Sequence, residues 1–77
     1  MATTGKAWAT ETGGLVYAWR DDSKDSAPWQ VRSELWDGGK YVGECIVPGT
    51  GNHRTPAAAE KEIARLAGDR GWREVTG

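Results

Sequence analysis

The stretch WQVRSELWDGGKYVGECIV, residues 29–47, is the part of the chain that decides the fold. Apolar and polar side chains alternate along both halves, and Asp37-Gly38-Gly39 separates the halves. Alternation is the pattern of a β-strand with one buried face, and a glycine-rich turn joins two antiparallel strands. The stretch therefore predicts a β-hairpin.

The turn type sets which side chains of this hairpin face the core. A three-residue turn with a glycine bulge is the favoured connection, and it places Leu35 opposite Tyr41 and Val31 opposite Cys45. A two-residue turn would instead bring Val42 and Ile46 inward. With the favoured turn, the predicted inward set is Trp29, Val31, Leu35, Tyr41, Cys45 and Val47, and the predicted outward set is Trp36, Val42 and Ile46.

A second hairpin is predicted in KAWATETGGLVYAWR, residues 6–20, around Gly13-Gly14. A two-residue turn there sets Trp8 opposite Trp19 and Thr10 opposite Tyr17. Which face of this hairpin is buried stays open. The polar segment DDSKDSAP that follows, residues 21–28, predicts an exposed loop.

Residues 55–70 predict a helix. Thr55 is a good N-cap, and Pro56 suits the first helical position. Gly71 is the predicted stop, with Trp72 folding back onto the last turn. The letters WREV that follow Gly71 predict a short final strand. The predicted buried stripe of the helix, at helical spacing, is Ala59, Ile63, Leu66 and Ala67, and the predicted outer side chains are Lys61, Glu62 and Arg65.

These elements predict an α+β fold, an antiparallel sheet of three or four strands with one C-terminal helix packed on one face. A chain of 77 residues has room for one domain, residues 1–77. Its predicted segments are a hairpin (6–20), an acidic loop (21–28), a hairpin (29–47), a glycine-rich loop (48–54), a helix (55–70) and a tail (71–77).

The amino-acid composition argues against a basic nucleic-acid-binding domain, a cysteine-based metal site and a membrane protein. The formal net charge of −1 lacks the basic footprint of most nucleic-acid-binding domains. Cys45 is the only cysteine, so no internal disulfide and no cysteine-based metal site is expected. No apolar run approaches the roughly 18 residues of a membrane span. We expect a cytoplasmic protein with no membrane association, no metal and no small-molecule cofactor.

No catalytic constellation is apparent, so we expect a protein that is not an enzyme. His53 is the only histidine, and no serine or cysteine lies near it in the sequence. Cys45 alternates toward the core, where a buried thiol is structural rather than reactive. The expected catalytic residues are therefore none.

The stretch VPGTGNHRTP, residues 47–56, allows two interpretations. Helix N-termini bind anions through free N–H groups, and His53 and Arg54 precede this one, with Lys61 two turns in. The glycines also suit a simple bend from strand to helix. Phosphate contact by His53, Arg54 and Lys61 and a purely structural bend both remain open.

The letters WQVRSELWDGGKYVGECIV and HRTPAAAEKEIARLA together resemble the second half of a double-stranded-RNA-binding domain. The order of three strands and a helix is also similar to the arm-type DNA-binding domain of tyrosine integrases. The resemblance spans roughly residues 15–68. It implies that Arg54 and Lys61 contact phosphate. The positions that carry it are Trp29, Gly43-Glu44, Arg54, Ala58-Ala59-Glu60 and Lys61.

Two functions follow, and both are binding functions. The first is an accessory nucleic-acid-binding module that uses the helix start and aromatic side chains on an open sheet face. The second is a protein-interaction module or homodimer that uses an apolar sheet face containing Trp36, Val42 and Ile46. We rank nucleic-acid binding first.

Overall fold

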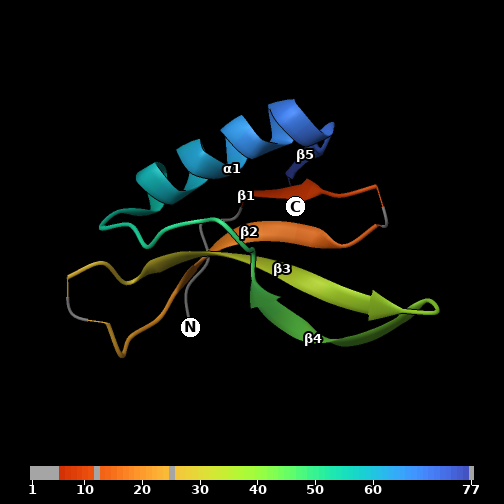
Figure 1. Cartoon of the computed structure of the whole chain (residues 1–77), viewed down its shortest axis with the longest axis horizontal. Coiled ribbons are helices and arrows are strands. Elements are labelled where there is room, and N and C mark those ends of the chain that lie inside the picture. Colours follow the sequence, from red (N-terminus) through yellow and green to blue (C-terminus); the bar gives the residue numbers. More distant parts are fainter. Residues whose placement is uncertain (1–5, 12, 25, 77) are drawn as a thin grey trace.

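The computed structural model describes residues 6–11, 13–24 and 26–76, and it has a five-stranded antiparallel sheet with one helix packed against it (Figure 1). The strand order is β4-β3-β2-β1-β5. The predicted α+β class is confirmed. The sheet exceeds the expected three or four strands because the segment after the helix pairs with the first strand. The elements are β1 (Lys6–Ala9), β2 (Leu15–Arg20), β3 (Trp29–Asp37), β4 (Lys40–Ile46), α1 (Pro56–Arg70) and β5 (Arg73–Thr76).

Helix α1 begins and ends at the predicted residues. The Thr55 hydroxyl accepts a hydrogen bond from the Ala58 N–H at 3.2 Å, and Pro56 occupies the first turn. Gly71 ends the helix in the left-handed conformation, with φ 77°. Its N–H donates to the Ala67 carbonyl at 2.8 Å, and the Trp72 N–H donates to the same oxygen at 3.1 Å. Both bonds go to one of the carbonyl groups that lie in the last turn, where a helix end leaves such groups without partners.

The core lies between α1 and one face of strands β1 to β3. Leu66, predicted in the stripe, is only half-buried. Trp29 and Trp72 pack against the core from its margins, so Trp72 does return to the helix as predicted. The buried apolar residues are Trp8, Val16, Ala18, Val31, Val47, Ala59, Ile63 and Ala67.

The predicted register of the first hairpin is wrong. Trp8 pairs with Val16, whereas Trp19 was expected opposite it. The connection runs from Thr10 to Gly14, whose carbonyl accepts the Thr10 N–H at 2.9 Å, so it is longer than the predicted two-residue turn. Thr10 consequently lies in the loop and does not pair with Tyr17.

The second hairpin turns tightly. Asp37 pairs with Lys40, so Gly38 and Gly39 form a two-residue turn with φ 58° and 81°. Positive φ at both positions matches the twist of the flanking strands and favours glycine. The predicted three-residue turn is therefore wrong.

From Leu35 toward the start of β3, the register is shifted by two residues from the prediction. The Val47 N–H donates to the Val31 carbonyl at 3.0 Å, whereas Val31 was predicted opposite Cys45. A shift of two residues preserves the face on which a side chain lies. Val31 and Val47 are therefore buried as expected.

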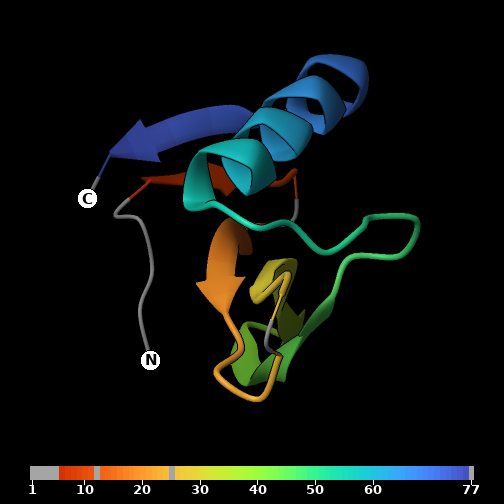
Figure 2. The same cartoon turned by 90° about the vertical axis from the view of Figure 1, so that its left-hand side faces the viewer.

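Leu35 and Tyr41 depart from the predicted inward set. A register irregularity between Leu35 and Trp36 sets Tyr41 opposite Trp36, whereas Leu35 pairs with Gly43. Leu35 and Tyr41 are 43% and 48% exposed. The reason is that α1 packs on β1 to β3, and the β3–β4 hairpin extends away from it (Figures 1 and 2).

Candidate interaction surface

Exposed apolar side chains gather on the β3–β4 hairpin. Among the described residues, six large hydrophobic side chains are exposed, and five belong to this hairpin. The sixth is Val75 on β5. We call the five the hairpin patch: Leu35, Trp36, Tyr41, Val42 and Ile46.

The patch has a defined local geometry. The rings of Trp36 and Tyr41 meet edge to face, with centroids 5.7 Å apart. The Trp36 indole N–H donates to Glu34 Oε1 at 3.1 Å, and the Leu15 N–H donates to the same oxygen at 3.0 Å. Glu34 thereby orients Trp36, which stays 46% exposed.

The rest of this sheet face carries a network of polar contacts. The Arg32 guanidinium lies 4.0 Å from the centre of the Trp19 ring and donates to Gln30 Oε1 at 3.0 and 3.1 Å. The Tyr17 hydroxyl donates to Glu44. Burial, and then this hydrogen bond, raise the pKa of Tyr17 above its ordinary value. Trp19 and Tyr17 are thus occupied by contacts within the chain.

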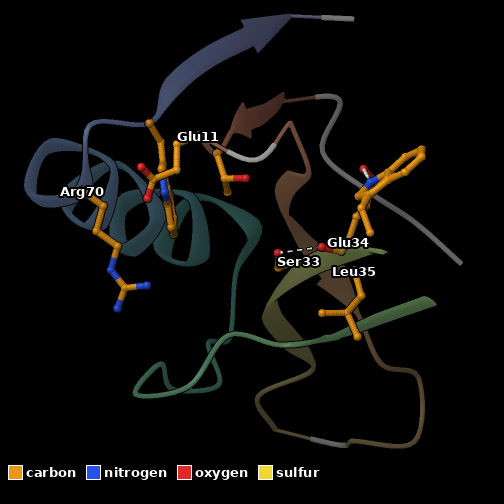
Figure 3. Close-up of a pocket in the computed structure, with 8 residues that line it drawn as sticks. Glu11, Ser33, Glu34, Leu35 and Arg70 are labelled. Carbon is orange, nitrogen blue, oxygen red and sulfur yellow. Dashed lines mark hydrogen bonds between the residues drawn. The ribbon is translucent and has the colours of Figure 1, made fainter. Parts of the chain in front are cut away.

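The sheet also carries a groove at the C-terminal end of α1. Leu35, Trp36 and Trp72 supply its apolar lining (Figure 3). Figure 3 shows Glu11 and Arg70 on one side of the groove and the β3 residues on the other. The Arg70 guanidinium lies 5.4 Å from the centre of the Trp72 ring. The lining of the groove is therefore part apolar and part charged, with Glu11 and Glu34 as its acidic groups and Arg70 as its basic group.

The predicted phosphate-binding residues lie at or near the helix start but differ in their surroundings. His53 is half-buried, and its Nε2 lies 2.7 Å from Glu62 Oε1. The Gly51 N–H donates to the same oxygen at 3.3 Å. Glu62, expected outside, is thus turned toward the loop, with its side chain only 15% exposed.

Arg54 and Lys61 are exposed, and Arg65 joins them on the outer side of α1. Arg65 lies one turn beyond Lys61, and its ion pair with Glu62 is long, at 3.8 Å. Arg54 and Lys61 take part in no ion pair within the described residues. We call Arg54, Lys61 and Arg65 the basic stripe.

Cys45 is half-buried on β4, opposite Ser33. In residues 6–11, 13–24 and 26–76, no group of three histidine, cysteine or acidic side chains is placed to hold a metal ion. Over the same residues, no helix has the length and apolar character needed to cross a bilayer.

The chain was compared with protein-family models, with curated proteins and with solved structures, and none of them matched.

Sequence reasoning named Trp36, Val42 and Ile46 and missed the other two members of the patch. Leu35 and Tyr41 alternate with core residues, so their exposure follows from the length of α1 and from the register irregularity. Glu62 was missed as the partner of His53 because the contact joins a loop to a helix. The hydrogen-bonding capacity of a histidine and a glutamate was the only signal in the sequence.

Proposed function

We propose that this chain is a non-enzymatic protein-interaction module whose binding surface is the hairpin patch. The single observation that carries the proposal is the concentration of five of the six exposed large hydrophobic side chains on one hairpin. Exposed apolar residues scattered singly are ordinary, but their concentration on one hairpin favours a binding surface, with Trp36, Tyr41 and Ile46 on one face and Leu35 on the other. Trp and Tyr are also the residues most enriched at interface hot spots.

The polar face of the sheet favours a protein partner over a nucleic acid. Base stacking needs free aromatic faces. Trp19 is covered by Arg32 and the Tyr17 hydroxyl is bonded to Glu44, which leaves Trp36 and Tyr41 as the exposed rings of this face. The carboxylates of Glu34 and Glu44 on this face would also repel phosphate.

Nucleic-acid binding is the second candidate, and the basic stripe is the observation that favours it. Arg54 is exposed just before α1, and Lys61 and Arg65 are exposed on α1 itself. In this function His53 fixes the loop through Glu62, and the three cations meet phosphate. Under either function we place the module in the cytoplasm, because its lone thiol suits a reducing compartment.

The test of the first function compares proteins retained from a cell extract by immobilised chains. A variant carrying Trp36→Ser and Val42→Ser should lose the partner that the unmodified chain retains. Val75→Ser is the matched control, because Val75 is the exposed apolar residue outside the hairpin patch. Equal retention by all three chains would refute the proposed surface.

The test of the second function is binding to fluorescent duplex DNA and RNA at low salt. Arg54→Ala, Lys61→Ala and Arg65→Ala should each weaken binding and lower the salt slope by about one. Lys24→Ala is the control, since Lys24 lies in the loop between β2 and β3. No measurable binding at low salt would rule the second function out.

A further inference from the structure

We propose that the partner of the hairpin patch is a second copy of this chain, with the hairpin tip of each copy seated in the groove of the other. The hairpin tip is the segment Asp37–Lys40. This inference rests on the proposed protein-interaction function and names its partner. Three features of the described residues carry it: the shape of the chain, four unpaired charges and the position of the apolar residues.

The shape is complementary to itself. The β3–β4 hairpin extends beyond α1, and the groove lies in the step between the end of α1 and the sheet (Figures 1 and 3). A projection and a recess in the same chain can each fill the other around a two-fold axis. Closed two-fold dimers are the commonest oligomers and use the same surface on both copies.

The charges are complementary as well. Asp37 and Lys40 flank the turn of the hairpin, and Glu11 and Arg70 line the groove. These four side chains take part in no ion pair within the described residues. Glu34 also lines the groove, but its carboxylate already accepts hydrogen bonds from the Trp36 indole and the Leu15 N–H. A seated tip sets Asp37 of one copy near Arg70 of the other, and Lys40 near Glu11. Arg70 is the groove residue that would contact Asp37, because it already lies against Trp72, which lines the groove.

The apolar residues lie where such a dimer needs them. Leu35 and Trp36 belong both to the hairpin patch and to the groove. They would therefore meet their own counterparts close to the two-fold axis, with the charged pairs on either side. An apolar centre with a polar rim is the usual anatomy of an interface.

The test is a charge exchange followed by sedimentation equilibrium from about 1 to 300 µM. The unmodified chain should be a dimer at the upper concentrations. Asp37→Arg and Arg70→Asp should each weaken dimerisation at least tenfold, because each sets like charges together twice per dimer. An equimolar mixture of the two single variants should dimerise again, since each tip then meets a groove of opposite charge. The double variant should also dimerise.

Matched controls separate charge from folding. Lys24→Asp reverses a positive charge, and Asp22→Arg reverses a negative one, both in the loop after β2. Both should dimerise like the unmodified chain. Circular dichroism of every variant should show one common fold. If Arg70→Asp does not fold, Glu11→Lys with Lys40→Glu repeats the exchange on the second pair.

The outcomes separate this inference from the function on which it rests. If the unmodified chain is monomeric at 300 µM, the partner is not a second copy. If both charge reversals leave dimerisation unchanged, or if the mixture of the two variants stays monomeric, the hairpin tip does not sit in the groove. In either case the hairpin patch keeps its proposed function if Trp36→Ser with Val42→Ser abolishes retention of another protein. If the chain with Trp36→Ser and Val42→Ser retains the same proteins as the unmodified chain, the proposed function fails too.

Discussion

The imidazole Nε2 of His53 lies 2.7 Å from Glu62 Oε1, and this contact fastens the loop before α1 to the helix itself. The backbone of His53 is held on its other side by Trp29, through two hydrogen bonds of 2.7 and 2.9 Å. His53 therefore bridges the start of β3 and the middle of α1. Its position is explained by the fold, whether or not a phosphate binds nearby.

Removing this contact should destabilise the domain without unfolding it. Glu62→Ala leaves the His53 ring and the Gly51 N–H without their shared acceptor. Losing a half-buried charged acceptor should lower the free energy of unfolding by about 1–3 kcal/mol. Urea denaturation measures this loss. Arg65→Ala is the control, because Arg65 is exposed and only weakly paired with Glu62, and it should change stability by less than about 0.5 kcal/mol.

Two tryptophans should respond in opposite ways to truncation. Trp8 is 5% exposed and belongs to the core, so Trp8→Ala should cost about 3–5 kcal/mol of unfolding free energy. Trp36 is 46% exposed, so Trp36→Ala should cost only about 0.5–1.5 kcal/mol, mainly through its contact with Tyr41. Chemical denaturation of both variants measures the two losses of unfolding free energy. Equal losses would place Trp36 in the core and remove the basis of the hairpin patch.

The helix stop at Gly71 depends on backbone conformation and not on space. A Cβ at this position would meet no heavy atom within 4 Å, but φ is +77°. Gly71→Ala should therefore lower the melting temperature, at a cost of about 1–2 kcal/mol for a left-handed alanine. Gly71→Asn should cost less, because asparagine adopts this conformation more readily. Equal effects of the two substitutions would show that steric contact, and not φ, selects glycine here.

Stability should fall in alkaline solution because of Tyr17. Its pKa is raised above the ordinary 10.0, first by burial and then by the hydrogen bond to Glu44. Above pH 10 the unfolded chain loses this proton while the folded chain keeps it, so rising pH favours unfolding. The urea midpoint should therefore drop between pH 9 and pH 11, and Tyr17→Phe should reduce the drop. An unchanged drop in Tyr17→Phe would assign the effect to other groups.

Local signals were enough to predict the helix. Thr55, Pro56 and Gly71 act on the backbone next to them, so the sequence fixes both ends of α1 without knowledge of the rest of the fold. The glycine turns were less informative. Gly13-Gly14 suits a short turn, but the loop starts at Thr10, and that longer loop changes the register of the first hairpin.

The candidate sites needed information that no local pattern carries. Leu35 follows the alternation of buried Val31, and it is exposed only because the helix does not extend over the end of the hairpin. The contact of His53 with Glu62 and that of Arg32 with Trp19 join different elements. Side chains that meet in this way are positioned by packing, so their roles emerge only with the fold.

The pairing of the first strand with the last has a consequence for how the domain sits in a larger assembly. Lys6 stands opposite Thr76, so both ends of the described chain leave from the β1–β5 side of the sheet. Strands β2 and β3 separate that side from β4. Neighbouring ends of this kind allow a domain to be inserted into the loop of a host protein. A host joined here would lie at the opposite margin of the sheet from the β3–β4 hairpin, so the junction would leave that hairpin uncovered.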